Sequence, residues 1–482
     1  MFPLSLSYWL CWSTTLQLTL SASPSPTLLR DVLIRAVNFF HDKVSVHGGY
    51  NWRYAADLTY AEGENAAGRQ TVWVQPPGTP AVGEAFLQAY LLTGEASCLT
   101  AAKDAAHCLL EGQLRSGGWQ DRIEFSSEAR TKIAYRRSQP ASSRAKNFSS
   151  LDDDKTQSAL RFLMRLDQAL SGSDASIHEA INYALTHLMK AQRPNGGWPQ
   201  VWEEPADANR YRDLRATIPS DWPRQHPKAD YWHYYTLNDS AHMDTVEVFL
   251  IAYAIYAKPE YLEAARRGGD FLMKAQLPDP QPAWAQQYDA EMRPAWARTF
   301  EPPAITGEES QRALLCLMNI YLHTGDPRYL EPIPSALHYL KSLRLPDGQL
   351  ARFYELGTNR PLYFNKRYEL TYDDDDLPQH YGFKVNDDTD RISKTYERYL
   401  RLKPHERERE KSRKLAYPPV KSPPSADTLT HLIQQQRSDG AWVERGKLRT
   451  YRGPNPPQEI ISSQTFINNI LMLARAITQR PQ

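Results

Sequence analysis

Apolar residues recur three or four positions apart over long stretches of the chain, and this spacing predicts amphipathic α-helices. The stretch after Gly94 is typical, because its apolar positions fall on one helical face: Leu99, Ala102, Ala106, Leu109 and Leu110. Prolines and glycines divide such stretches into short helices joined by loops. The pattern therefore predicts an all-α protein.

Several of these predicted helices end in similar sequences. Each ending combines the last helical turn, a loop that contains glycine or proline, and an aromatic residue. Glycine suits the left-handed residue that closes a helix, and the aromatic ring can fold back on the helix before it. The endings are "LLEGQLRSGGWQDR" from Leu109, "LMKAQRPNGGWPQVW" from Leu188, "LMKAQLPDPQPAWAQQY" from Leu272, "YLKSLRLPDGQLARFYEL" from Tyr339 and "LIQQQRSDGAWVER" from Leu432.

A second recurring sequence predicts tight turns between other helices. "LLTGEASCL" and "LHTGDPRYL" contain Thr-Gly followed by an acidic residue, and "YAKPEYL" predicts a similar turn. One unit is therefore a helix, a short turn, a second helix and a long aromatic loop. Trp119, Trp198 and Trp284 are about 80 positions apart, and a repeat of helix pairs with this period indicates a toroid or a solenoid of hairpins.

The predicted architecture brings distant residues together. In a closed ring of hairpins, the long loops that link each outer helix to the next inner helix share one face. Side chains in these loops, or just before an inner helix, converge there. The aromatic residues, Trp198 among them, can line a groove for a polymeric sugar. The alternative is that they only cover helix ends.

Acidic residues precede two of the predicted inner helices. "SSLDDDKTQSALRFL" places Asp152, Asp153 and Asp154 before one helix, and "HYYTLNDSAHMDTVEVFL" places Asn238 and Asp239 before another. Each of these residues is an ordinary choice for a helix N-cap. Three aspartates in a row are more than one cap needs, and two acidic clusters on one face can hold Ca²⁺, which prefers oxygen ligands.

Basic side chains gather in the next two long loops. "PAWARTFEPPAITGEES" carries Arg298 and Glu301 just before a predicted inner helix. "LARFYELGTNRPLYFNKR" then supplies further cations, which are Arg352, Arg360, Lys366 and Arg367. Cations on a face that also carries carboxylates predict a site for an acidic ligand, since the planar guanidinium of arginine matches carboxylates. The alternative is a loop held by ion pairs to Glu301 or Glu355.

Composition and other motifs narrow the class of protein. Lys and Arg total 57 and Asp and Glu total 56, so the chain lacks the basic excess of a nucleic-acid binder. No G-x-S-x-G elbow, H-E-x-x-H helix or phosphate-binding loop occurs in the sequence. Cys98 and Cys108 lie too far apart on one predicted helix to form a disulfide, and with Cys316 they are interpreted as buried thiols.

The first residues predict export. Residues 1–23 contain an apolar stretch, no acidic residue and small residues at the end, which is typical of a secretory signal peptide, although an early Lys or Arg is missing. The alternative is a poorly ordered extension. No other apolar run is long enough to span a bilayer. We therefore expect a secreted or periplasmic protein with neither a membrane nor a nucleic-acid partner.

Motifs in the central part of the chain resemble a known enzyme family. "NGGWPQ", "YTLNDSAHM", "AWARTFEPPAITGEES" and "ARFYELGTNRP" together resemble the family-10 pectate lyases, exported enzymes with an (α/α) toroid. "SSLDDDKTQSALRFL" resembles the "TIDNGAT" helix start of that family, and the resemblance extends from Asp152 to Tyr363. It implies one (α/α) toroid domain over residues 24–482, with an extra N-terminal helical region at 28–115 and closing helices at 385–482.

The resemblance also implies roles for individual residues. Asp152 and Asp239 match aspartates of the family's calcium site, and Arg298 matches the arginine assigned as the Brønsted base. The family's "GRDG" loop reads "FNKRYE" here, and its "TGYAWY" reads "QHYGFKV". The expected substrate-binding residues are Arg352, Arg360, Lys366, Arg367, Trp198, Asn238 and Glu301.

The resemblance implies a specific reaction. We expect a monomeric, calcium-dependent pectate lyase that cleaves polygalacturonate by β-elimination at the C4 glycosidic bond and leaves an unsaturated product. The alternatives are a lyase or hydrolase that acts on another uronide polysaccharide, a terpene cyclase on a similar toroid, and a non-catalytic pectin-binding relative.

Overall fold

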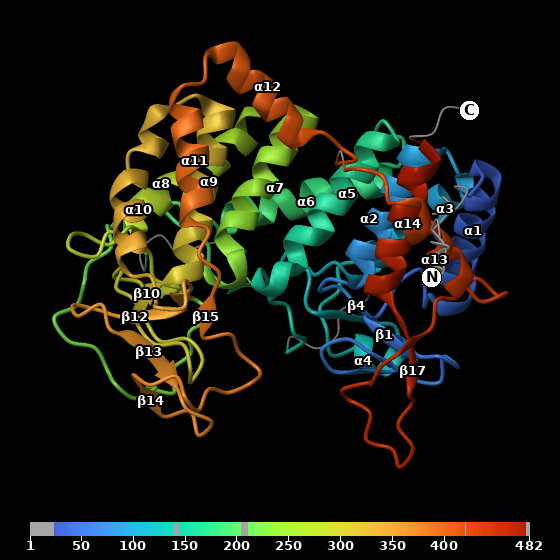
Figure 1. The fold of residues 1–482 in the computed structure, drawn as a ribbon, viewed down its shortest axis with the longest axis horizontal. Coiled ribbons are helices and arrows are strands. Elements are labelled where there is room, and N and C mark those ends of the chain that lie inside the picture. The colour runs from blue at the N-terminus through green and yellow to red at the C-terminus, as the bar shows by residue number, and fades with distance from the viewer. Residues whose placement is uncertain (1–23, 139–143, 204–210, 420, 479–482) are drawn as a thin grey trace, which may run out of the picture.

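The computed structural model describes residues 24–138, 144–203, 211–419 and 421–478, and helices dominate it (Figure 1). The predicted signal peptide, residues 1–23, lies outside the described residues. Long loops and short strands lie on one side of the helices, at the bottom of Figure 1, as the hairpin repeat predicts. The all-α toroidal class is therefore confirmed.

The helices form an inner and an outer layer of antiparallel hairpins. The inner helices are α2 (Thr79–Thr93), α5 (Lys155–Ala169), α7 (Ala241–Tyr256), α9 (Gly307–Thr324), α11 (Thr389–Leu400) and α14 (Ser463–Thr478). The outer helices are α1 (Pro26–Phe39), α3 (Ala96–Gly112), α6 (Ala175–Ala191), α8 (Pro259–Ala275), α10 (Ile333–Ser342) and α13 (Ala426–Gln435). Helix α14 packs between α1 and α2, so the two ends of the chain meet in one hairpin.

Tryptophans of the long loops fix the ends of four of the six outer helices, α3, α6, α8 and α13. Each indole is buried, and its Nε1–H donates a hydrogen bond to a carbonyl near the end of the helix that precedes it. The pairs are Trp119 with Leu109 (2.8 Å), Trp198 with Leu188 (2.9 Å), Trp284 with Leu272 (2.8 Å) and Trp442 with Leu432 (3.0 Å). The last carbonyls of a helix lack intrahelical donors, so such a bond gives a buried carbonyl a partner. Leu272 is the exception, because its carbonyl also accepts from the Gln276 N–H at 3.1 Å.

Glutamines in the same endings join neighbouring outer helices. Each side chain leaves the end of one outer helix, and its amide nitrogen donates to a carbonyl of the next outer helix or of its N-cap. The pairs are Gln113 with Ala180 (2.9 Å), Gln192 with Ala264 (3.0 Å), Gln276 with Pro332 (3.0 Å) and Gln436 with Val32 (2.9 Å). The last pair links α13 to α1.

Short antiparallel strands lie on the face that carries the long loops. One sheet has the order β16-β17-β1-β2-β3, and in it Arg53 pairs with Ser462, which ties the C-terminal segment to the N-terminal region. Its strands are β1 (Arg53–Ala55), β2 (Ala61–Glu62), β3 (Ala66–Ala67), β16 (Glu444–Arg445) and β17 (Glu459–Ser462). A second sheet has the order β10-β12-β13-β14, with β10 (Ala304–Thr306), β12 (Phe353–Glu355), β13 (Pro361–Phe364) and β14 (Leu370–Thr371).

Two-stranded sheets hold the remaining loops. They pair β4 (Thr71–Trp73) with β5 (Arg122–Glu124), β6 (Ser149–Ser150) with β7 (Val201–Trp202), β8 (Tyr235–Thr236) with β9 (Gln287–Tyr288), and β11 (Leu350–Ala351) with β15 (Lys384–Val385). The other short elements are the π-helix η1 (Phe40–Val44), helix α4 (Ser127–Arg130) and the 3₁₀ turns η2 (Asp152–Asp154), η3 (Asn238–Ser240) and η4 (Pro327–Leu330).

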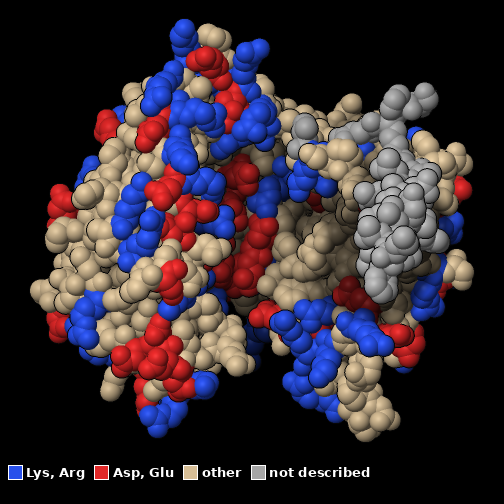
Figure 2. All heavy atoms as spheres, in the orientation of Figure 1, with Lys and Arg blue, Asp and Glu red and all other residues tan. Residues whose placement is uncertain are grey.

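Among the described helices the inner layer is open between α11 and α14, since α11 packs on α9 and α10 whereas α14 packs on α1, α2 and α13. Helix α11 packs on α9 and α10 and buries Thr389, Ile392 and Tyr399. The next helix, α12 (Pro404–Leu415), has Glu410 as its buried residue, because its sequence is almost entirely charged. It packs on α9 instead of extending the inner layer. Figure 2 shows the molecule hollowed between these two ends, with acidic and basic side chains gathered in the hollow.

The core is continuous through the hairpins. Cys98, Cys108 and Cys316 are free and buried, as predicted from their positions on helices. Among the described helices, none combines the length and the apolar character that crossing a membrane requires.

Candidate active site

Two turns with the same backbone shape precede α5 and α7. In η2, Asp153 and Asp154 have φ of 49° and 60°, and in η3, Asp239 and Ser240 have φ of 48° and 61°. Non-glycine residues rarely adopt this left-handed conformation, which costs on the order of 1–3 kcal/mol per residue and is found mainly at functional sites. The turns therefore aim polar side chains in directions that a regular helix start does not allow.

Equivalent backbone hydrogen bonds hold the two turns in place. The Leu151 N–H donates to the Gln200 carbonyl, and the Leu237 N–H donates to the Gln286 carbonyl, each at 2.8 Å. The side chain of Gln157 in α5 then bridges the turns, because its amide donates to the Leu151 carbonyl (2.8 Å) and to a carbonyl at the start of α7 (3.3 Å). The two acidic segments, far apart in the sequence, are thereby adjacent.

Three carboxylates meet where the turns touch. Oxygen atoms of Asp152, Asp153 and Asp239 lie within 4.8 Å of one another. Burial, followed by the charge of Asp152, raises the pKa of Asp153 to about 7, and the same two causes raise the pKa of Asp239. Asp154 points elsewhere and accepts a hydrogen bond from Arg161 at 2.6 Å. A cluster of hard oxygen donors with unfavourable mutual repulsion fits a divalent cation such as Ca²⁺.

A lysine stands inside this cluster. The Lys155 ammonium is 3.1 Å from an oxygen of Asp152 and 3.8 Å from one of Asp153, and the residue is 8% exposed. Burial lowers its pKa, but the charges of Asp152 and Asp153 outweigh burial, so the net direction is upward. Lys155 therefore carries a positive charge next to the carboxylates.

Arg298 reaches the same carboxylates from the loop before α9. Its guanidinium lies 3.9 Å from Asp152, 3.5 Å from Asp239 and 3.5 Å from the buried carboxylate of Glu301. The Glu301 carboxylate also accepts a hydrogen bond from the Arg298 backbone N–H at 3.0 Å, which fixes the start of the side chain. Burial lowers the pKa of Arg298, but Glu301, Asp152 and Asp239 raise it further, so the net pKa is above its ordinary value.

A tyrosine connects Arg298 to a second arginine. The Tyr381 hydroxyl donates to Glu301 at 3.0 Å and accepts from Arg352 at 3.2 Å. Arg352 also donates to Glu308 at 2.7 Å, and its guanidinium lies 4.7 Å from the centre of the Tyr381 ring. The two arginines are thus held by one continuous network, and of the two Arg298 is the one that pairs with the carboxylates of Asp152 and Asp239.

The sequence of this region matches a known family. Residues 113–350 match the model of the pectic acid lyases, and this range includes both acidic turns and Arg298. The chain carries a pectic acid lyase domain. Its enzyme class is therefore polysaccharide lyase, which agrees with the resemblance found in the sequence motifs.

Among solved structures, several enzymes are similar to this lyase. A family 10 polysaccharide lyase from Cellvibrio cellulosa, solved as a mutant with trigalacturonic acid, is 18% identical, with a TM-score of 0.46, and the match covers 66% of this chain and 98% of that one. Cellobiose 2-epimerase from Spirochaeta thermophila is 14% identical, with a TM-score of 0.42 and coverage of 96% and 99%. Among curated proteins, no sequence matches. The enzyme class therefore rests on the family match.

Two of the expected substrate-binding residues of the lyase, Asn238 and Glu301, are buried and hydrogen-bonded to other residues of the site. Asn238 is 4% exposed; its amide donates to Asp239 at 2.8 Å and its oxygen accepts from Gln286 at 2.6 Å. Glu301 is 1% exposed and holds Arg298 and Tyr381. Asn238 therefore orients Asp239, and Glu301 orients Arg298.

Trp198 does not line a groove in the lyase. Its side chain has no exposed surface, it packs against Phe249 with ring centres 5.7 Å apart, and its indole nitrogen is bonded to Leu188. A buried ring cannot stack on a sugar, so its expected role in substrate binding is corrected to one in packing.

The basic loop lies apart from the carboxylate network. Arg360 stacks over the Tyr372 ring at 3.4 Å, and the two other cations form exposed local pairs: Lys366 with Asp376 at 2.6 Å and Arg367 with Glu369 at 2.8 Å. The acidic "TYDDDD" segment therefore offsets part of the charge of this loop. The loop meets the site through Tyr368, whose ring stacks on Phe300 at 5.7 Å.

Sequence reasoning left three residues of the network without a role. Asp153 was counted as one of three aspartates, Lys155 follows them directly, and Tyr381 lies in the segment "QHYGFKV". The signal for the first two was the unusual run "DDDK", which places a cation beside three acids. Nothing in the local sequence indicated that Tyr381 returns to the loop face.

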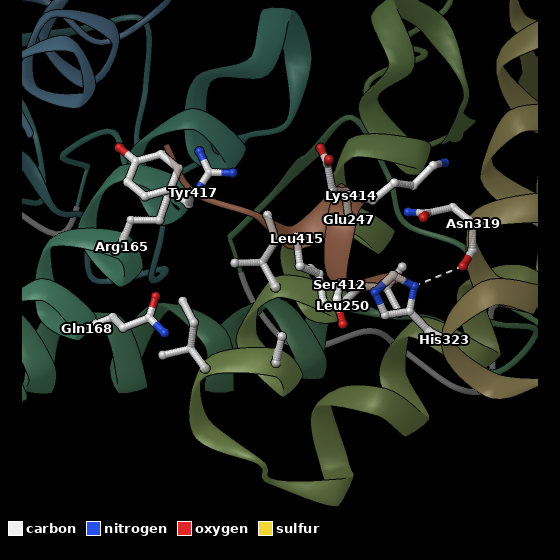
Figure 3. A pocket seen from close by; sticks show the side chains of 13 residues that line it. Arg165, Gln168, Glu247, Leu250, Asn319, His323, Ser412, Lys414, Leu415 and Tyr417 are labelled. Atoms are coloured by element: carbon white, nitrogen blue, oxygen red, sulfur yellow. Dashed lines mark hydrogen bonds between the residues drawn. The ribbon is translucent and has the colours of Figure 1, made fainter. Parts of the chain in front are cut away.

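A pocket of about 440 Å³ lies at the other end of the inner helices (Figure 3). Arg165 of α5 and His323 of α9 line it from opposite sides, and Leu415 and Tyr417 cover it from the segment around the end of α12. The Arg165 guanidinium lies 4.5 Å from the centre of the Tyr417 ring. This end of the ring is therefore partly covered, whereas the acidic turns of the lyase lie at the opposite helix ends.

Proposed function

We propose that the lyase is a calcium-dependent pectate lyase that cleaves polygalacturonate by β-elimination at the C4 glycosidic bond. The observation that carries this proposal is the convergence of Arg298 on Asp152 and Asp239, at 3.9 and 3.5 Å, within the matched domain. This arrangement combines oxygen ligands for a cation with a guanidinium that can face an anionic sugar.

The difficult step is the removal of the C5 proton of a uronate. The neighbouring carboxylate makes this proton weakly acidic, but its own negative charge opposes formation of a second negative charge on the enolate-like species. Ca²⁺ bound by Asp152 and Asp239, with Asp153 beside them, would offset this developing charge. The protein preorganises these carboxylates through the two left-handed turns.

Arg298 takes the C5 proton in this proposal, as the family resemblance implies. The electron pair of the C5–H bond then forms the C4–C5 double bond, the C4–O bond breaks, and the leaving oxygen takes a proton from water. The carboxylates around Arg298 raise its pKa and oppose this role. Arg298 can therefore act as a base only when the charges of Asp152 and Asp239 are offset in the complex.

Arg352 binds the carboxylate of the substrate. Its guanidinium is half-buried, and Glu308 and Tyr381 fix its position. A planar guanidinium can donate a hydrogen bond to each carboxylate oxygen of a uronate, and a fixed position reduces the entropy lost on binding. Arg360, Lys366 and Arg367 would attract further uronates of the polymer from their more distant loop.

The organisation of the chain belongs to the same proposal. Residues 24–482 form one catalytic domain, in which 28–115 are an additional N-terminal region and 385–482 are the C-terminal helices. The apolar N-terminal sequence supports secretion, and an acidic polysaccharide substrate outside the cell agrees with it. We expect the enzyme to act as a monomer.

The test is a screen of uronide polymers with purified protein. With polygalacturonate and Ca²⁺ at alkaline pH, we expect ultraviolet absorbance from the new C4–C5 double bond, and a chelator should abolish it. Reducing ends without unsaturation would identify a hydrolase instead. Binding without turnover that is unchanged in Arg298→Ala would identify a non-catalytic binding protein, and either result would overturn the proposal.

A further inference from the structure

The two acidic turns share a backbone but differ in charge. The residues at equivalent places are Asp152 and Asn238, Asp153 and Asp239, Asp154 and Ser240, and Lys155 and Ala241. The pairs Asp153 and Asp239, and Asp154 and Ser240, have similar left-handed φ and ψ, and so the two turns have the same shape. The first turn thus has an additional carboxylate in the cluster, and it also has a cation where the second turn has alanine. The additional negative and positive charges lie together.

Lys155 is positioned to act as a fixed counter-ion. It is the first residue of α5, and its side chain turns back to the carboxylates of Asp152 (3.1 Å) and Asp153 (3.8 Å). Only 8% of the residue is exposed, so solvent screens its charge weakly. Arg298 approaches the cluster from the opposite loop, and the carboxylates therefore have two cationic partners from the protein itself.

A divalent cation must compete with this ammonium. Ca²⁺ binds six to eight oxygens at 2.3–2.6 Å in typical sites, and its affinity rises with the number of uncompensated carboxylates. An ammonium beside Asp152 and Asp153 repels the incoming ion and already occupies one of their oxygens. The third carboxylate, Asp239, has no lysine partner but faces Arg298 at 3.5 Å.

We propose that Lys155 is a built-in cation that lowers the calcium affinity of this site, so that the enzyme is saturated only at about millimolar Ca²⁺, the range of extracellular calcium modules. This inference rests on the proposed function, because it takes Asp152 and Asp239 as the calcium ligands. It adds that the chain's own lysine sets the calcium concentration at which the site fills.

Calorimetric titration of the full-length protein with CaCl₂ tests this inference without any substrate. Lys155→Met keeps the length of the side chain and removes its charge, and we expect it to bind Ca²⁺ at least tenfold more tightly than wild type. Lys155→Arg keeps the charge and should stay within threefold of wild type. Lys132→Met removes an exposed lysine that pairs with Glu128, and it should leave the affinity unchanged.

Thermal unfolding gives a second measurement if Lys155→Met is less stable. The melting temperature is then measured with and without 5 mM CaCl₂, a concentration above the dissociation constant expected for wild type. The rise on adding CaCl₂ should be larger in Lys155→Met than in wild type. Equal or weaker calcium binding in Lys155→Met, or no binding in either protein, would overturn the inference. Because neither measurement uses turnover, tighter binding in Lys155→Met together with no cleavage of polygalacturonate would count against the proposed function alone.

Discussion

Replacement of Tyr381 by phenylalanine isolates the connection between the two arginines. The change removes the hydroxyl that donates to Glu301 and accepts from Arg352, and it keeps the ring. The ring retains its contacts with Phe300, at a centre-to-centre distance of 4.7 Å, and with Phe353 at 6.4 Å. We therefore expect the fold to be preserved while Arg298 and Arg352 lose a shared restraint.

The size of the effect follows from the hydrogen bonds that are lost. Each bond joins the Tyr381 hydroxyl to a charged group, and such bonds contribute about 1.5–3 kcal/mol. Water can replace part of this contribution at Arg352, whose side chain is 13% exposed, but little of it at Glu301, which is 1% exposed. If the loss of these bonds raises the activation free energy by about 2 kcal/mol, kcat falls about 30-fold.

The assay is the initial rate of double-bond formation over a range of polygalacturonate concentrations. Tyr381→Phe should lower kcat, because Tyr381 orients Arg298 through Glu301. It should leave KM within about threefold, because Arg352 keeps its hydrogen bonds to Glu308 and to the Gly382 carbonyl. Tyr372→Phe is the matched control, since its hydroxyl also donates to a buried glutamate, Glu355 at 2.9 Å, away from Arg298. The control should keep wild-type kcat.

Two results would refute this reasoning. Full kcat in Tyr381→Phe would mean that Glu301 alone orients Arg298. A similar loss of kcat in Tyr381→Phe and Tyr372→Phe would mean that general loosening of the loop face, and not this network, lowers the rate.

Further predictions concern catalysis, packing and pH. Arg298→Ala should lower kcat at least about a thousandfold and should keep the fold by circular dichroism, but with a lower melting temperature, because it removes the cation beside Asp152, Asp239 and the buried Glu301. Trp198→Ala should destabilise the fold by about 3–5 kcal/mol in denaturant unfolding, whereas Trp232→Ala, at a residue that is 51% exposed, should cost less than about 0.5 kcal/mol. Burial lowers the pKa of His242 to about 4, so the unfolded state binds its proton first as pH falls. Relative to His242→Gln, wild type should therefore lose up to about 3 kcal/mol of unfolding free energy between pH 6.5 and pH 4.

The helical repeat was predictable because similar sequences recur at the ends of the outer helices. The sequence endings around Trp119, Trp198, Trp284 and Trp442 predicted an aromatic that folds back on its helix, and the indole–carbonyl bonds confirm this. The glutamines of the same endings were also visible in the sequence. Their role could not be read from it, because their acceptors lie on the next outer helix, about 70 residues or more away in three of the four pairs.

The convergence of Asp152, Asp239 and Arg298 was predictable for the same reason, since a hairpin repeat determines which loops share a face. The directions of individual side chains were not. Trp198 has the right residue type for a sugar platform, but only its tertiary packing decides between the surface and the core. The left-handed φ angles of Asp153 and Asp239 were also hidden, because aspartate usually adopts other backbone conformations.

The open ring has a similar explanation. Helix α11 is strongly amphipathic, so its sequence predicts one buried face, and it does bury one face against α9 and α10. Amphipathicity does not reveal whether a second neighbour follows. The charged sequence of α12, in which Glu410 is the buried residue, is the feature that explains why the inner layer ends there.

The position of the site at helix starts gives it a field that favours an anionic polymer. Helices α5 and α7 begin directly after the acidic turns, and α9 begins after the loop that carries Arg298. Each N-terminus is equivalent to about half a positive charge. This field stabilises the clustered carboxylates of Asp152, Asp153 and Asp239 in the free protein, which reduces the cost of holding them 4.8 Å apart or closer. A bound cation offsets the charge of those carboxylates. The helix N-termini, Arg298 and Arg352 then leave a net positive field on the loop face, and this field attracts the carboxylates of the substrate.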